Sequence, residues 1–195
     1  SYEIAMPTVD SQVVAIKSAN LDIFINIATP KFAAQAIKKV AELGWHPIHI
    51  MTNVSASVGA VLKPAGLENS KGILTAQYQM DVTDPQWDST PGMQRFRAFM
   101  EKYYPEADRA ESGPLTAWNT STALVEVLRR CGDNLTRENV MKIVANMDFE
   151  IGNYLPGIRV KTTPTDFYPI EQVQMSRFTG TNWELFGPVL DGHAE

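Results

Sequence analysis

The chain of 195 residues contains one cysteine, Cys131, and three histidines, His46, His49 and His193. A single cysteine excludes an internal disulfide and a thiolate metal cluster, and we interpret Cys131 as a buried or idle thiol. His46 and His49 flank a predicted strand three residues apart, which directs them to opposite faces and argues against a shared metal. The sequence also lacks HExxH, GxSxG and glycine-rich phosphate motifs. We therefore predict no catalytic residue, no metal site and no cofactor.

Clustered positive charge and long apolar runs are also missing. The net charge is −5, and no basic run is longer than Lys38-Lys39 or Arg129-Arg130. Binding to a phosphate backbone needs a clustered positive surface, so nucleic acid is not an expected partner. No apolar stretch approaches the roughly 20 residues of a membrane span. The opening SYEIAMP has neither the charged nor the apolar region of a signal peptide. The compartment stays open, because a mature exported protein would also lack that peptide.

Residues 21–45 carry the clearest pattern that is present. A short apolar run, 23–25, ends in small and polar residues, and Pro30 then opens a helical pattern that Gly44 closes. Thr29 suits the N-cap of this helix, and Pro30 suits its first turn. The segment predicts a buried strand, a tight loop and a covering helix. Ligands of open parallel sheets usually bind where a strand's carboxyl end meets the amino end of the next helix.

The first 80 residues alternate between helical and strand patterns. A strand tail is predicted at 2–5, a helix at 9–16, and further strands at 47–51 and 72–78. This alternation predicts an α/β fold, in which a parallel sheet has helices on both faces.

The pattern changes at Asp81. A polar, proline-bearing segment without periodicity follows, and we interpret it as a linker or crossover. Three helical patterns come next between residues 91 and 147, the last with Thr136 as its N-cap. From about Pro156 the chain is strand-like and ends in a predicted hairpin around 180–182.

The predicted sheet suggests a binding site. If strands 22–26 and 47–51 are parallel neighbours, their carboxyl ends bring Ala28-Thr29 and the loop with Asn53 to one rim. Thr29 can donate or accept a hydrogen bond, and Asn53 can do both at once. The alternative stays open that Thr29 only caps its helix and Asn53 only shapes a turn.

Three segments together resemble a known family. They are FINIATPKFAAQAIKKVAELGW, GPLTAWNTSTALVEVLRRCG and the closing TPTDFYPIEQVQMSRFTGTNWELFGPV. They resemble the carboxyl-terminal half of periplasmic solute-binding proteins of the branched-chain amino acid (leucine/isoleucine/valine-binding) family, which serve ABC importers. The resemblance implies a type I periplasmic binding protein, in which two α/β lobes joined by three crossovers close over a small ligand.

By this resemblance, Ala28 and Thr29 fall where the second lobe contacts its ligand. Asn53 falls where amino-acid-binding members have a glutamate that pairs with the ligand's ammonium group. An amide cannot neutralise a buried ammonium, and an unpaired buried charge is very costly. The resemblance therefore favours an aromatic or other hydrophobic carboxylate over an amino acid.

The resemblance also implies that the chain is a fragment. Residues 1–80 would be an incomplete second lobe without its first strand and helix, and residues 81–150 a crossover with helices that pack on an absent first lobe. Residues 151–195 would be a returning segment with the last strands. We expect a gap beside two strands with unpaired backbone groups, exposed apolar helix faces, and marginal stability or self-association of the isolated chain.

The leading functional hypothesis is a solute-binding component of an ABC importer. It would be periplasmic, or extracytoplasmic and lipid-anchored, and its partners would be a small ligand, a membrane permease and the missing first-lobe segment. A sensor or regulatory domain of the same fold is the alternative. An α/β enzyme is a third hypothesis, which the lack of a nucleophile, metal or phosphate motif disfavours.

Overall fold

The computed structural model of the protein describes residues 1–192, so His193 and the end of the predicted segment 151–195 lie outside the described residues. The described residues form two compact units. Unit 1 comprises Ser1–Ala76, Asp108–Ser112 and Met175–Phe186. Unit 2 comprises 77–107, 113–174 and the residues from 187 onward. No helix among residues 1–192 is both long and apolar enough to cross a membrane.

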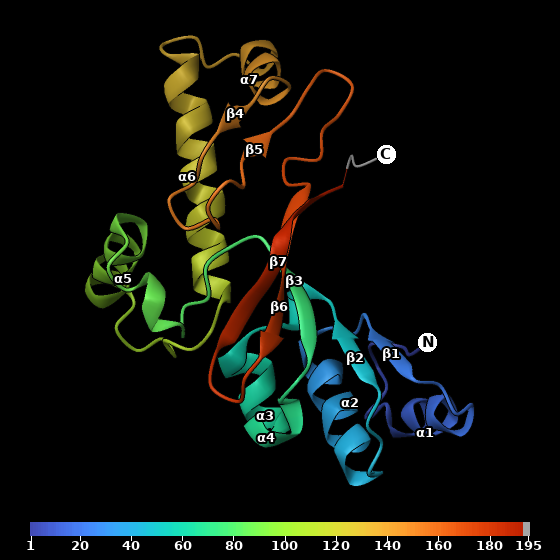
Figure 1. The fold of residues 1–195 in the computed structure, drawn as a ribbon. Coiled ribbons are helices and arrows are strands. Elements are labelled where there is room, and N and C mark those ends of the chain that lie inside the picture. Colours follow the sequence, from blue (N-terminus) through green and yellow to red (C-terminus); the bar gives the residue numbers. More distant parts are fainter. Residues whose placement is uncertain (193–195) are drawn as a thin grey trace. The chain divides into compact units, whose positions relative to one another are not determined.

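Unit 1 is built on parallel strands joined by helices (Figure 1). In chain order its first elements are α1 (Asp10–Ser18), β1 (Ile23–Asn26), α2 (Pro30–Glu42), β2 (Ile48–Met51) and β3 (Leu74–Gln77). β1 pairs with β2 in parallel, with Ile23 opposite Ile48 and Asn26 opposite Met51, and β2 pairs with β3 in parallel. The predicted parallel α/β arrangement is confirmed. The strand tail predicted at 2–5 is wrong, because these residues form a turn closed by a hydrogen bond from the amide of Met6 to the carbonyl of Glu3.

The segment between β2 and β3 is divided into short turns and helices. It consists of a 3₁₀ turn η1 (Asn53–Ser55), a π-helical turn η2 (Val58–Leu62), and the short helices α3 (Lys63–Ala65) and α4 (Leu67–Ser70). Ser57 caps η2, since its hydroxyl accepts a hydrogen bond from the amide of Ala60. The rim of the sheet is therefore followed by tight turns rather than by one long helix.

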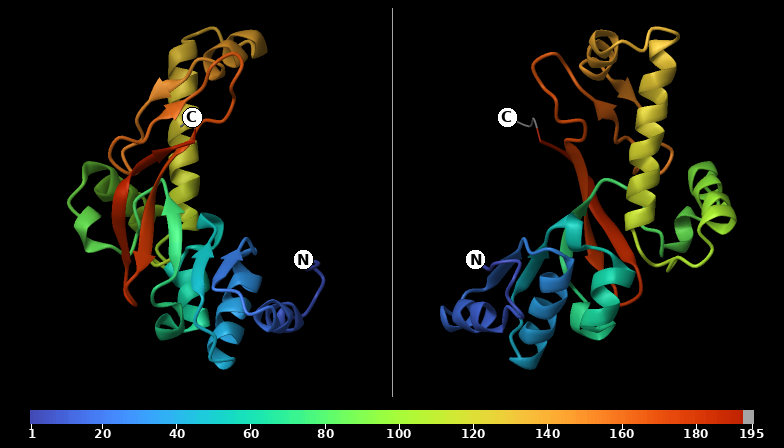
Figure 2. Two further views of the ribbon diagram at one scale, coloured as in Figure 1. Left: turned by 45° about the vertical axis from the view of Figure 1, so that its right-hand side comes forward. Right: turned by 180° about the vertical axis from the view of Figure 1, so that it is seen from behind.

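The core of unit 1 lies between the strands and the layer of helices on one side of them (Figure 2). α2 is the central helix of this layer, because it contacts α1, η2, α3 and α4. The core cluster includes large side chains with at most 2% of their surface exposed: Phe32, Ile37, Val61, Leu62, Phe178 and Trp183. Alternation along β1 sends Phe24 and Asn26 into this side.

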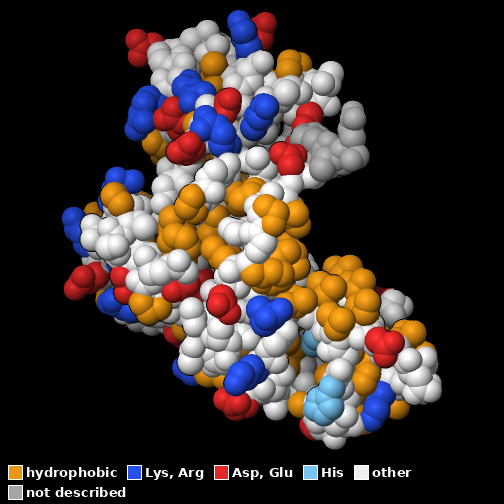
Figure 3. Space-filling view, in the orientation of Figure 1, with side chains coloured by type: hydrophobic (Ala, Val, Ile, Leu, Met, Phe, Trp, Pro, Cys, Tyr) orange, Lys and Arg blue, Asp and Glu red, His pale blue; other side chains and the backbone are white. Residues whose placement is uncertain are grey.

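The opposite face of β1 and β2 is open. Ile23, Ile25 and Ile48 are 50%, 62% and 54% exposed, and hydrophobic side chains gather over this face in Figure 3. The expectation of helices on both faces is therefore wrong for these two strands. That expectation arose because Ile23, Ile25 and Ile48 are apolar, and apolar side chains on both sides of a strand are typical of a sheet that is covered on both faces.

β1 ends the sheet. The strand order is β1-β2-β3-β6-β7, with β6 (Gln172–Phe178) and β7 (Trp183–Asp191) as the last two strands. The predicted gap beside two strands is thus an open edge on one strand, β1. The predicted hairpin is confirmed, because the turn Thr179–Asn182 joins the neighbouring strands β6 and β7 and is closed by a hydrogen bond from the amide of Thr179 to the carbonyl of Asn182.

Unit 2 contains the three helices predicted after the linker. They are α5 (Pro91–Tyr103), α6 (Gly113–Cys131) and α7 (Arg137–Val144), accompanied by the 3₁₀ turn η3 (Pro85–Trp87) and by β4 (Asp148–Phe149) paired antiparallel with β5 (Val160–Lys161). Thr136 caps α7 as predicted, because its hydroxyl accepts from the amide of Asn139 at 3.4 Å. Cys131 is buried at the end of α6, as predicted.

A hydrogen-bonded polar network lies inside unit 2. The side-chain amide of Gln79 donates to Thr116 at 2.9 Å, Asn119 donates to Gln79 at 3.3 Å, and Asn153 donates to Asn119 at 3.2 Å. Asn119 and Asn153 are each 1% exposed. Burying an amide is costly unless it is hydrogen-bonded. The network therefore fixes the position of α6 relative to the chain around residues 79 and 153.

Candidate functional site

The predicted site lies where β1 and β2 end. Because Asn26 is opposite Met51, the loops that follow leave the sheet side by side. The amide of Thr52 donates to the carbonyl of Asn26 at 3.0 Å, which extends the pairing by one step. Ala28-Thr29 and Asn53 therefore belong to adjacent loops on the same rim, as the sequence predicts.

A buried serine joins the two loops. The hydroxyl of Ser55 donates to the carbonyl of Ala28 at 2.6 Å, and Ser55 has no exposed surface. One residue further, the carbonyl of Ala56 accepts from the indole of Trp183 at 2.9 Å. Neither contact could be predicted, because a lone serine or tryptophan carries no periodic signal. Together they fix the loop of Asn53 to its neighbour and to β7.

Asn26 holds the other side of the Ala28 loop. Its side-chain oxygen accepts from the amide of Ala28 at 3.1 Å, and its nitrogen lies 3.2 Å from Nε2 of His49. With the amide oxygen committed to Ala28, the Asn26 nitrogen donates to Nε2, which leaves the hydrogen of neutral His49 on Nδ1. Burial lowers the pKa of His49 to about 4, so this ring is uncharged at neutral pH.

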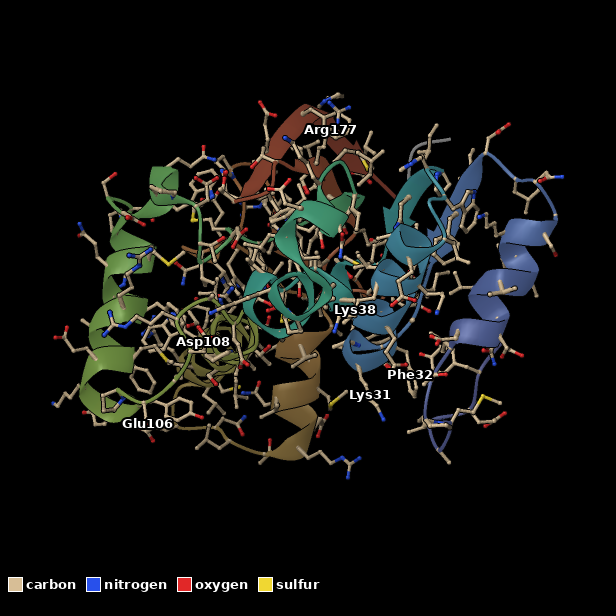
Figure 4. All side chains as sticks on the ribbon, turned by 90° about the horizontal axis from the view of Figure 1, so that it is seen from below. Lys31, Phe32, Lys38, Glu106, Asp108 and Arg177 are labelled. Atoms are coloured by element: carbon tan, nitrogen blue, oxygen red, sulfur yellow. The ribbon has the colours of Figure 1, made fainter. Side chains whose placement is uncertain are left out.

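Thr29 occupies the N-cap position of α2 that the sequence predicts, but its side chain makes no capping hydrogen bond. Its amide instead donates to the hydroxyl of Tyr2 at 2.8 Å, and that hydroxyl donates to Oγ1 of Thr29 at 3.3 Å. In the first turn that follows, Nζ of Lys31 lies 5.2 Å from the ring centre of Phe32 (Figure 4). Sequence reasoning missed Tyr2, which it placed at the end of a strand.

The three predicted residues differ in what they present. Ala28 is 9% exposed and its amide and carbonyl are both engaged, so it contributes shape more than hydrogen bonds. Thr29 and Asn53 are exposed. The rim thus presents a hydroxyl and an amide, with Lys31 as the nearest cation along the chain, and it can recognise a ligand through hydrogen bonds.

A hollow occurs in unit 2, lined by none of the rim residues. In unit 2 an open hollow of about 500 Å³ runs along α6 between Trp118, Val125 and Phe149, and Glu126 and Arg129 line its polar side. The charges of its polar side are paired with each other, since Glu126 lies 2.9 Å from both Arg129 and Arg130. No group of histidine, cysteine and carboxylate side chains within residues 1–192 is placed to hold a metal ion.

Parallel strands, covering helices and a rim of polar turns define the class of open α/β ligand-binding lobes. A family model described as periplasmic binding protein matches residues 1–182. The chain belongs to this family. A search of curated protein sequences finds no significant match.

Solved structures show the same fold. One is a branched-chain amino acid ABC transporter protein from Thermus thermophilus with bound valine, at 17% identity and a TM-score of 0.80, over 95% of this chain and 50% of that one. Another is a leucine-binding protein from Thermotoga maritima, at 15% identity and a TM-score of 0.66, over 97% and 50%. A third is a fatty acid ABC transporter substrate-binding protein from Thermomonospora curvata, at 17% identity and a TM-score of 0.67, over 98% and 49%. The chain spans about half the length of these structures. The resemblance to a type I periplasmic binding protein is confirmed.

Proposed function

We propose that this chain supplies one side of the ligand cleft of an extracytoplasmic solute-binding protein that serves an ABC importer. The observation that carries the proposal is the rim of unit 1, where Ser55 ties the loop of Ala28 and Thr29 to the loop of Asn53. Because these contacts already hold the two loops in place, little conformational entropy is lost when a ligand binds between them. The protein would bind its solute and deliver it to a membrane permease without making or breaking bonds, so we propose no enzymatic step.

The proposed ligand is a small aromatic or hydrophobic carboxylate. Asn53 cannot pair with the ammonium group of an amino acid, and no carboxylate of η1 replaces it, since η1 consists of Asn53, Val54 and Ser55. Val54 is 68% exposed beside Asn53 and offers an apolar contact. The likeness to a fatty acid binding protein supports this ligand class, whereas the likeness to valine- and leucine-binding proteins supports the transport role without the ammonium contact.

The other side of the cleft would come from a first-lobe segment of the same protein that this chain does not contain. Two surfaces support this partner. In unit 1 the open edge of β1 adjoins the exposed face formed by Ile23, Ile25 and Ile48. In unit 2, Leu124 and Leu128 of α6 are 56% and 41% exposed. Exposed apolar faces that gather several side chains usually mark contact surfaces. We propose residues 1–80 as an incomplete second lobe, 81–150 as a crossover with helices that pack on the absent first lobe, and 151–195 as a returning segment with the last strands.

A binding experiment on the complete two-lobed protein tests the proposal. A thermal-shift screen against benzoate, phenylacetate, octanoate and L-valine should show stabilisation by a carboxylate and none by valine. Thr29→Ala and Asn53→Ala should each weaken binding of the best ligand about three- to tenfold, as expected for one hydrogen bond.

Thr8→Ala is the matched control, because Thr8 is exposed in the same unit and belongs to neither rim loop. It should leave affinity unchanged. Unchanged affinity in both rim variants would remove the assigned site, and stabilisation by valine alone would remove the proposed ligand class.

A further inference from the structure

Tyr2 is fixed in place beside the rim although it lies far from it in the sequence. Its ring packs on Phe32 of α2 with 4.5 Å between ring centres. The segment that carries it is tied to the same helix further along, because the side chain of Gln35 donates to the carbonyl of Pro7 at 3.0 Å. Phe32 is 2% exposed, so the ring of Tyr2 packs against the buried core of unit 1.

The hydroxyl of Tyr2 makes one short hydrogen bond and one long one. Its oxygen accepts from the amide of Thr29 at 2.8 Å, which is a good hydrogen bond. Its own proton is directed to Oγ1 of Thr29 at 3.3 Å, longer than the roughly 2.7–2.8 Å that is usual between two oxygens. A better acceptor at the rim would therefore capture this proton.

We propose that Tyr2 is a ligand-binding residue that donates its phenolic proton to an oxygen of the bound solute, beside Thr29. The proposal deepens the proposed function and rests on it. The amide of Thr29 keeps the Tyr2 oxygen in position, so the hydroxyl can turn its proton from Oγ1 to the solute without moving the ring. A site with such a donor selects solutes that carry an oxygen there, because an analogue without it leaves the hydroxyl without a full partner.

The competing explanation is that Tyr2 only anchors the segment of residues 1–10 to α2. The two roles differ in their consequences. If the hydroxyl merely occupied the Thr29 amide, its removal would free that amide for the solute, and affinity would stay the same or rise. If the hydroxyl donates to the solute, its removal lowers affinity although the ring still packs on Phe32.

The test uses Tyr2→Phe in the complete two-lobed protein, with the best-binding carboxylate among benzoate, phenylacetate and octanoate as the probe. Calorimetry should show an affinity about tenfold lower than that of the parent. Tyr168→Phe is the matched control, because Tyr168 is 75% exposed in unit 2, and it should bind as the parent does.

Amide hydrogen exchange separates a direct contact from a loosened loop. The amide of Ala28, which donates to Asn26, should exchange in Tyr2→Phe as it does in the parent. Unchanged or tighter binding by Tyr2→Phe, or weaker binding together with faster exchange at Ala28, would overturn the role of Tyr2 and leave the proposed function standing. If the parent binds none of the three carboxylates, the proposed ligand class falls, and the role of Tyr2 with it.

Discussion

The two units differ in what fills their interiors. Unit 1 packs aliphatic and aromatic side chains from α2, η2 and the hairpin into one apolar cluster, and the buried polar side chains of Asn26 and Ser55 lie at its rim. Unit 2 places the network of Gln79, Thr116, Asn119 and Asn153 inside the protein. An apolar core tolerates rearrangement as long as volume is kept, whereas a polar network depends on geometry. We therefore expect unit 1 to tolerate substitutions in its core better than unit 2 does.

Their surfaces are alike in one respect. Each unit buries one side of its elements and leaves another side apolar and exposed: Ile25 on β1 in unit 1, Leu124 on α6 in unit 2. The contrast between the units thus lies in the interior, and both remain open to a further partner. Substitutions should therefore have their largest effect inside unit 2 and their smallest on the exposed faces.

Gly92→Ala should damage unit 2 most. A Cβ at this position of α5 would lie 2.1 Å from the carbonyl oxygen of Gly152 and 2.5 Å from Oδ1 of Asn153. Backbone must move to relieve the first contact, and the network moves with Asn153. We expect a loss of about 4 kcal/mol of unfolding free energy, measured by urea denaturation. Gly113→Ala is the control, because nothing lies within 4 Å of its added Cβ. Equal stability of both variants would contradict the geometric dependence assigned to unit 2.

Acidification should weaken unit 1 through His49. Its pKa is lowered to about 4 in the folded state against an unfolded value of 6.5. Between these values the unfolded chain binds more protons, so the stabilisation is complete above about pH 6.5 and is lost as the pH falls towards 4. The loss should reach about 3 kcal/mol in denaturation curves between pH 7 and pH 4. His49→Gln should flatten this dependence, while His46→Gln, at an exposed position, should preserve it. An unaltered slope in His49→Gln would show that other groups control it.

Leu124→Ala with Leu128→Ala should have the smallest effect in this chain. Both side chains are already exposed on α6, so we expect a change below about 0.5 kcal/mol. In the complete two-lobed protein the same pair should cost about 2 kcal/mol or more, because we propose that the first-lobe segment covers it. Denaturation of both proteins, each with and without the substitutions, makes the comparison. A small effect in both would show that α6 faces solvent in the complete protein.

Local pattern was enough to predict the scaffold of the site. The strands, the loop at Ala28 and the helix that starts at Pro30 follow from periodicity and end signals within 25 residues, and the parallel pairing of β1 with β2 follows from their alternation with helices. The apolar pattern of α5 is buried only in part, since Met93 and Phe96 are 0% and 5% exposed but Tyr103 is 62% exposed.

Contacts between distant residues could not be predicted. Asn26 and His49 stand alone in apolar runs, and only the register of β1 with β2 brings them together. Tyr2 was assigned to a strand because Tyr2-Glu3-Ile4-Ala5 has strand-like composition, whereas packing on Phe32 decides its place. The assignment of Ala28, Thr29 and Asn53 as ligand contacts stays a prediction.

The hydrogen bond from Trp183 to the carbonyl of Ala56 spans 127 positions of the chain. A contact that closes so large a loop is slow to form, because the entropy of the intervening chain is lost before the contact rewards it. During synthesis β1, α2 and β2 can assemble early, but the turn that carries Asn53 acquires its final anchor only after the last hairpin has been made. Affinity for the solute would therefore be the last property to mature in a newly made molecule, after its secondary structure is complete.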